Sequence, residues 1–208
     1  MMIKRKLTAW LFTIALAAPL SVATAGEPRS GYEYIKQATR DMQDDDFENP
    51  GLLTVEKGQA LFNAQPDGAG KSCAACHGAG GEGLDVKKIA LYPDYKVNGR
   101  VSLQNQINTC RVSNGCSTLQ TTHPDPLSLA TFVRNRAAGE PVNVHTDGPM
   151  EPLLVIGEQL YRQRYGLIDM SCQHCHDFYP GQMIRGQKIS QGMGNGFPAY
   201  RLDIGEIT

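Results

Sequence analysis

Two five-residue motifs contain the residues best suited to chemistry, and both have the pattern Cys-x-x-Cys-His. The first spans residues 73–77 and the second spans residues 172–176. Cysteines three positions apart can form thioethers with the two vinyl groups of one porphyrin, and the adjacent histidine can bind the iron. The motifs therefore predict two covalently bound haem c groups. The predicted attachment cysteines are Cys73, Cys76, Cys172 and Cys175, and the predicted proximal iron ligands are His77 and His176.

Two other kinds of site use closely spaced cysteines. A redox-active Cys-x-x-Cys pair requires no following histidine, and a structural zinc ion requires four ligands. Neither alternative accounts for a histidine after both pairs together with the duplication. Haem attachment accounts for both features, so the spacing favours it.

Each motif ends a longer repeated segment. Residues 55–77 and 154–176 match without a gap at an offset of 99 positions, and Gly58 matches Gly157. A repeat of this length indicates a duplicated domain rather than a solenoid turn. We therefore predict a first domain over 26–140, a linker over 141–149 and a second domain over 150–208.

Helices are expected to position both motifs. In the second copy, Leu153, Ile156 and Leu160 recur at helical spacing, and Pro152 lies where proline favours a helix start. The composition also favours small helices joined by long loops, because only 7% of the residues are aromatic while 22 are glycine and 12 are proline. The predicted fold class is therefore all-α.

The matched glycines predict a close helix crossing. Glycine inside a helix costs about 1 kcal/mol relative to alanine, so Gly58 and Gly157 need a packing reason. A helix predicted over 127–138 could cross the first copy at Gly58, with Leu129 and Phe132 facing it.

The N-terminus has the pattern of a secretory signal peptide. Residues 4–6 are basic, residues 7–20 are apolar, and small residues precede a cleavage point after Ala25. The apolar run is shorter than the ~20 residues that span a bilayer. We therefore predict a signal peptide over 1–25, an exported mature protein and no membrane span after cleavage. The formal net charge of −1 provides no basic field for nucleic acid.

The spacing of the residues does not decide which side chain binds the first iron opposite His77. Methionine is common in electron-transfer cytochromes, but none occurs between His77 and the linker. The candidates are Cys110, Cys116 and His123. Cys110 could be an axial thiolate, which would lower the haem potential, or could form a disulfide with Cys116. His123 fits an exposed loop better.

Three segments resemble the SoxA family of dihaem cytochromes. They are QNQINTCR (104–111), SCQHCHD (171–177) and IRGQKISQGMGNGFPAYRL (184–202), and the last is the most specific. The resemblance implies two tandem class I cytochrome c-like domains in the periplasm, with Cys110 as the axial thiolate of the first haem. It leaves the state of Cys116 open.

The resemblance also implies a place in sulfur oxidation. The implied partner is the monohaem cytochrome SoxX, and the implied activity is L-cysteine S-thiosulfotransferase. In that reaction, thiosulfate is joined oxidatively to a cysteine of the carrier SoxYZ, and electrons pass through haem to a cytochrome c acceptor. A dihaem electron-transfer protein or a docking subunit without its own catalysis is the alternative.

The chain departs from the family near Thr208. The family continues with an arginine-rich segment that bears the catalytic cysteine and then a closing helix. We therefore expect no catalytic cysteine in this chain, an incomplete second domain and an exposed apolar helix face. Met183 and Met193 could replace the distal ligand. Three cations could balance haem propionates, attract thiosulfate or lie on an ordinary surface: Arg185, Lys188 and Arg201.

Overall fold

The computed structural model describes most of the chain beyond the predicted signal peptide. The described residues are 27–66, 70–96, 99–120, 123–193, 200–201 and 206–207. The predicted signal peptide over 1–25 lies outside them, as does part of the family-like stretch over 184–202.

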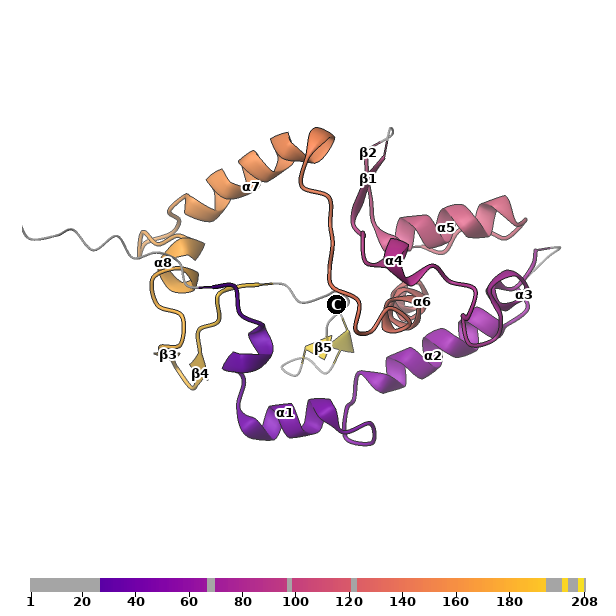
Figure 1. Ribbon diagram of the computed structural model, residues 1–208, viewed down its shortest axis with the longest axis horizontal. Coiled ribbons are helices and arrows are strands. Elements are labelled where there is room, and N and C mark those ends of the chain that lie inside the picture. The colour runs from indigo at the N-terminus through magenta and orange to yellow at the C-terminus, as the bar shows by residue number, and fades with distance from the viewer. Residues whose placement is uncertain are drawn as a thin grey trace, which may run out of the picture.

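The described chain is rich in helix, as the sequence predicts, and short hairpins are additional to that expectation (Figure 1). The α-helices are α1 (Gln37–Asp44), α2 (Leu52–Asn63), α3 (Cys73–His77), α4 (Val86–Ile89), α5 (Leu103–Ser113), α6 (Pro124–Asn135), α7 (Glu151–Arg162) and α8 (Cys172–His176). Two 3-10 turns are η1 (Gly31–Tyr34) and η2 (Gly148–Met150). Three antiparallel pairs join β1 (Asp94–Lys96) to β2 (Gly99–Val101), β3 (Met183–Ile184) to β4 (Gln187–Lys188), and β5 (Tyr200–Arg201) to β6 (Glu206–Ile207).

The core of the first half forms where α2 crosses α6. A Cβ atom on Gly58 would lie 2.1 Å from the Ser128 carbonyl oxygen and 2.7 Å from Phe132 Cβ. Only a glycine allows this approach without a shift of the helices. The predicted crossing at Gly58 is therefore confirmed.

Helix α6 contributes buried apolar side chains at Leu129, Ala130, Phe132 and Val133. It begins at Pro124, earlier than residue 127, because the His123 side chain accepts a hydrogen bond from the Asp125 amide and caps the helix. Helix α6 packs with α2 and α4 through a cluster of buried residues. These are Phe62, Ile89, Leu129, Phe132, Val133 and Ala137.

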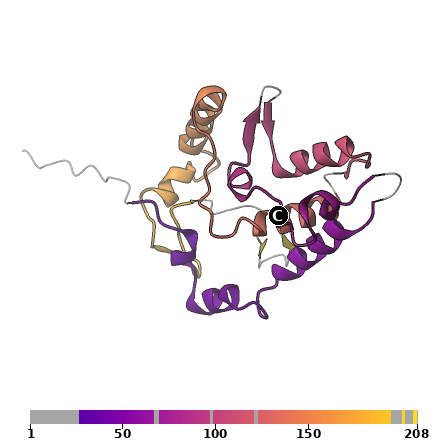
Figure 2. The same cartoon turned by 45° about the vertical axis from the view of Figure 1, so that its right-hand side comes forward.

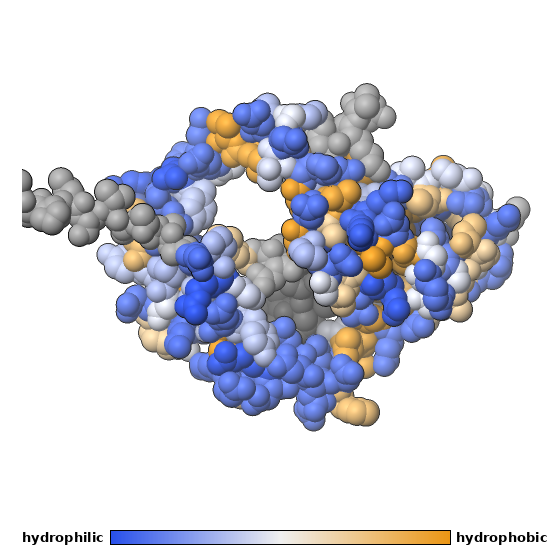
Figure 3. All heavy atoms as spheres, in the orientation of Figure 1, coloured by the Kyte–Doolittle hydropathy of each residue, from blue (hydrophilic) through white to orange (hydrophobic). Residues whose placement is uncertain are grey.

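Helix α7, in the second copy of the repeat, is less buried than α2 in the first copy. Helix α7 begins at Glu151 with Pro152 in its first turn, as predicted. Its apolar side chains stay exposed: Leu153 by 42%, Ile156 by 52% and Leu160 by 51%. In the part of the chain that the structure describes, no atom would lie within 4 Å of a Cβ on Gly157. Figure 3 shows apolar surface over this helix.

The N-terminal segment lies against the second half before it reaches the first. The segment that contains η1 lies beside the β3–β4 hairpin, and α1 then leads to α2 (Figures 1 and 2). The Gln191 side chain bonds the backbone of Glu27 and Arg29 there. Among the described residues, no helix is long and apolar enough to cross a membrane.

Candidate functional site

Local hydrogen bonds place the first motif on a single helical turn. The Ser72 hydroxyl oxygen accepts a hydrogen bond from the Ala75 amide at 3.2 Å and starts α3. Gly78 has a φ of +77°, a conformation that glycine adopts readily, and it ends the helix directly after His77. The two cysteines of α3 therefore lie one turn apart, with the histidine beside them.

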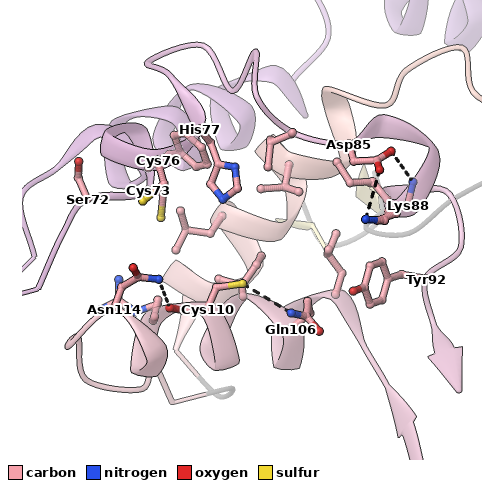
Figure 4. Close-up of a pocket in the computed structure, with 18 of the residues that line it drawn as sticks. Ser72, Cys73, Cys76, His77, Asp85, Lys88, Tyr92, Gln106, Cys110 and Asn114 are labelled. Atoms are coloured by element: carbon pink, nitrogen blue, oxygen red, sulfur yellow. Dashed lines mark hydrogen bonds and ion pairs between the residues drawn. The ribbon is translucent and has the colours of Figure 1, made fainter. Parts of the chain in front are cut away.

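A cavity opens between α3 and α5. Figure 4 shows His77 pointing across this cavity toward the helix that carries Cys110, with Cys73 and Cys76 beside His77. The Phe62 ring lies 6.3 Å from the His77 ring, centroid to centroid. The apolar lining is Phe62, Leu84, Ile89, Leu103, Ile107, Leu129 and Val133.

Helix α5 forms the wall opposite the motif. Its N-terminus is capped by Ser102, whose hydroxyl oxygen accepts a hydrogen bond from the Asn105 amide at 3.1 Å. Residues three, four and seven positions apart share one helix face. Leu103, Gln106 and Cys110 follow this spacing and line the cavity, and Gln106 Nε2 donates to Cys110 Sγ at 3.5 Å. The structure thus brings Cys110 into the cavity that the first motif lines.

The other two candidate ligands lie elsewhere. Cys110 and Cys116 are both free thiols, so the alternative of a disulfide between them is not formed. Cys116 is buried, and its Sγ lies 3.5 Å from the Lys71 carbonyl oxygen. His123 is the N-cap of α6 and does not line the cavity.

The end of the cavity far from the cysteines is polar. Figure 4 places Lys88, Asp85 and Tyr92 there, and Lys88 Nζ lies 3.5 Å from Asp85 Oδ2. Lys88 would offer a positive charge to the carboxylates of a haem attached through Cys73 and Cys76. Sequence analysis missed Lys88 and Tyr92, because no motif marks them. Burial raises the pKa of the Cys73 thiol, although Arg111 opposes the shift.

The residues that line this cavity fit a haem c group. Two thiols and an imidazole lie along one wall, a third thiol lies on the opposite wall, and the walls between them are apolar. Apolar walls with few polar groups are typical of cofactor sites.

The second motif has its own hydrogen bonds. The Ser171 hydroxyl lies 2.7 Å from His174 Nδ1, so His174 is turned back toward the start of α8. His176 Nδ1 donates to the Ser190 carbonyl oxygen at 2.8 Å. That bond leaves Nε2 as the nitrogen available to iron. Sequence analysis missed Ser190, because a backbone carbonyl carries no residue signature.

A tyrosine in the second copy takes the position of Phe62. Tyr161 donates a hydrogen bond from its hydroxyl to Asp177 Oδ1 at 2.7 Å, next to the predicted ligand His176. Burial, and then the hydrogen bond to Asp177, raise the pKa of Tyr161 to about 12. The phenol therefore stays protonated above pH 10, where a free tyrosine ionises, and its hydrogen bond links α7 to the end of α8.

The remaining candidates lie around the β3–β4 hairpin. The side chains of Met183 and Met193 are exposed by 60% and 48%. Arg185 occupies the hairpin turn with a φ of +51°, and Lys188 lines a second cavity beside α1. The side chain of Arg201 lies outside the part of the chain that the structure describes.

Comparisons with known proteins identify the family of this chain. The family model described as SoxA/TsdA, cytochrome c domain, matches residues 57–142. A crystal structure of SoxXA from P. pantotrophus superposes with a TM-score of 0.73 at 31% identity, covering 87% of this chain and 69% of that one. The chain belongs to the SoxA family. It contains a cytochrome c domain, and this favours haem over the redox-pair and zinc alternatives.

Curated SoxA proteins are similar over most of this chain. The L-cysteine S-thiosulfotransferase subunit SoxA of Rhodovulum sulfidophilum is 37% identical over 179 residues, which are 85% of this chain and 62% of that protein. The subunit from Paracoccus pantotrophus is 33% identical over 181 residues, with 86% and 62% covered. The chain thus spans less than two thirds of the length of these SoxA relatives.

Proposed function

We propose that this chain is the dihaem cytochrome subunit of a periplasmic sulfur-oxidising complex. One observation carries the proposal: Cys73, Cys76 and His77 share a largely apolar cavity with Cys110 in a chain of the SoxA family. A plain cytochrome would also need the first three residues. The opposing thiol is the feature that the sequence resemblance associates with SoxA.

The residues have separate roles in the proposed first centre. Cys73 and Cys76 would attach the haem, His77 would bind its iron, and Cys110 would provide a thiolate as a further ligand. When bound, the haem supplies reversible one-electron transfer. The apolar walls exclude water, and Lys88 at the far end offers a positive charge to a propionate.

The second motif supports a second centre. Cys172, Cys175 and His176 take the equivalent roles, and the Ser190 carbonyl orients His176. We assign the two centres to tandem domains over 26–140 and 150–208, joined by a linker over 141–149. Each domain then contributes one motif of the repeat.

The substrate and partners follow from the relatives. Proteins similar to this chain are named L-cysteine S-thiosulfotransferase subunits, and the similar solved structure is named SoxXA. We therefore propose SoxX as the partner and thiosulfate as the substrate, joined to a cysteine of SoxYZ with a cytochrome c as electron acceptor. Export by a signal peptide over 1–25 would bring the chain to the periplasm.

Mass spectrometry of the exported chain tests the haem assignment. Each attached haem adds about 616 Da, so we expect two such adducts. Replacing Cys172 and Cys175 with alanine should remove one adduct, and replacing Cys73 and Cys76 should remove the other. The Cys116→Ala variant should keep both, and a chain without adducts would contradict the proposal.

A conjugation assay tests the reaction. The exported chain and SoxX are mixed with SoxYZ, thiosulfate and oxidised cytochrome c, and the mass of SoxYZ is measured. Formation of the SoxYZ–thiosulfate conjugate would support the transferase role and would contradict the expectation that this chain has no catalytic cysteine. Reduction and oxidation of both haems without conjugate would favour the alternative of an electron-transfer or docking subunit without its own catalysis.

A further inference from the structure

The loop that follows β4 holds His176 closely. The Ser190 carbonyl oxygen accepts a hydrogen bond from His176 Nδ1 at 2.8 Å. A Cβ atom on Gly192 would lie 3.2 Å from the same nitrogen, so the backbone passes directly against the imidazole. Gly192 also has a φ of +72°, which favours glycine. We call residues 190–192 the histidine loop.

The hairpin fixes one end of the histidine loop. The Ile189 amide donates to the Gln182 carbonyl oxygen at 2.8 Å, and the Gly181 amide donates to the Ile189 carbonyl oxygen at 2.7 Å. These bonds extend the β3–β4 pairing up to the residue before Ser190. The chain is therefore anchored immediately before the carbonyl that His176 uses.

The N-terminal segment fixes the loop from the other side through Gln191. Gln191 Oε1 accepts a hydrogen bond from the Arg29 amide at 2.6 Å, and Nε2 donates to the Glu27 carbonyl oxygen at 3.1 Å. Both partners are backbone groups, more than 160 residues away in sequence. The Gln191 amide thus bonds this segment much as a neighbouring strand would.

We propose that Gln191 is a positioning residue for the axial histidine of the second centre, and that the N-terminal segment 27–29 is its anchor. This inference rests on the proposed second haem. The bond to Ser190 gives the His176 imidazole more anionic character. With a haem bound, this would make Nε2 a stronger ligand and would lower the potential. If Gln191 releases the histidine loop, that bond weakens and the potential rises.

The inference connects the start of the mature chain to the second centre. Glu27 and Arg29 are the second and fourth residues after the predicted cleavage point at Ala25. The segment therefore belongs to the first domain in sequence but acts on a ligand of the second.

An EPR-monitored redox titration of the dihaem protein tests the inference. Gln191→Met keeps the approximate size of the side chain but removes the amide. We expect an upward shift of the second haem potential and an altered low-spin signal, while the first haem is unchanged. Deletion of residues 26–29 from the mature chain should reproduce the shift.

Two matched variants serve as controls. Gln187→Met makes the same replacement on the exposed β4 strand, and Glu27→Ala removes a side chain whose backbone carbonyl is the partner. Neither should shift the potential. Hydrogen exchange adds a readout outside the haem, because the Arg29 amide should exchange faster in Gln191→Met.

Unchanged second-haem potentials in both Gln191→Met and the deletion, with two haems retained, would overturn the inference. Failure of the proposed function is distinct from that result, since it would appear as fewer than two attached haems before any substitution.

Discussion

At the level of single residues, Cys110 as the proposed thiolate ligand would set the electronic character of the proposed first centre. Its thiol lies on the wall opposite His77, within reach of Gln106 Nε2. A thiolate ligand donates charge to ferric iron and lowers the potential, whereas a methionine raises it. The same cavity could therefore hold a low-potential or a high-potential haem, depending on one side chain.

Replacing Cys110 with methionine tests this role. We expect the first haem potential to rise by a substantial part of the roughly 0.8 V range that axial ligands span. The thiolate-type low-spin EPR signal should disappear. Cys116→Ala is the matched control, because Cys116 is buried against Lys71 rather than lining the cavity. A thiolate signal that survives in Cys110→Met would contradict the assignment.

Tyr161 makes the stability of the second half depend on alkaline pH. Its pKa is about 12 in the folded chain, above the ordinary value of 10.0. The resulting stabilisation is complete below about pH 10 and is lost as the pH rises through about 12. The Tyr161→Phe variant cannot form the hydrogen bond to Asp177. Its unfolding free energy at neutral pH should therefore be lower by about 1 kcal/mol.

Denaturant unfolding of the native chain and Tyr161→Phe at neutral pH and across pH 10 to 12 measures this difference. The native chain should lose more stability across that window than the variant. If the unfolding free energies of the native chain and the variant fell by the same amount between pH 10 and 12, the Tyr161–Asp177 bond would not be the source of the pH dependence.

At the level of elements, the same helix of the repeat has two different surroundings. Helix α2 buries Gly58 against Ser128 and Phe132 of α6. Gly157 of α7, by contrast, has no described atom within 4 Å of the point where a Cβ would lie. Identical residue types at matching positions therefore have opposite tolerance for a larger side chain.

Alanine at the two glycines gives a paired test. Gly58→Ala should lose about 1–3 kcal/mol of unfolding free energy, because the new methyl group forces α2 and α6 apart. Gly157→Ala should be neutral or gain up to about 1 kcal/mol from higher helix propensity. Thermal unfolding followed by circular dichroism measures both variants. Equal losses at the two positions would contradict the described packing.

At the level of the whole molecule, the apolar side chains are unevenly buried. The principal buried cluster lies in the first half, around Leu129 and Phe132. Helix α7 in the second half leaves Ile156 and Leu160 about half exposed. Contiguous exposed apolar surface favours association and dye binding. Self-association and dye binding of the 208-residue chain should therefore depend on the exposed face of α7.

Replacing Ile156 and Leu160 together with glutamine should reduce binding of a hydrophobic dye and self-association. Because both side chains are exposed, unfolding free energy should change by only about 0.5 kcal/mol for each. Leu129→Ala, in the buried cluster, should instead lose about 2–5 kcal/mol. Fluorescence and light scattering measure the first effect. Unchanged dye binding in the glutamine variant would place the apolar surface elsewhere.

The sequence by itself determined the features that depend on local spacing. Cysteines three positions apart and a following histidine share one turn when their segment is helical, so the prediction of haem attachment at each motif needed only five residues. The crossing at Gly58 was predictable as well, because a glycine on an apolar helix face costs stability unless a neighbouring helix approaches closely there.

Only the tertiary structure decided which groups meet across long separations. Spacing left Cys110 and Cys116 as alternatives, and the packing of α5 placed the first in the cavity and the second against Lys71. The bonds between Gln191 and the backbone of Glu27 and Arg29 had no sequence signature at all. Contacts of this kind depend on how the helices and hairpins pack together. In addition, every residue type except proline has the same backbone N–H and C=O groups, so the sequence does not show which backbone group a side chain will bond.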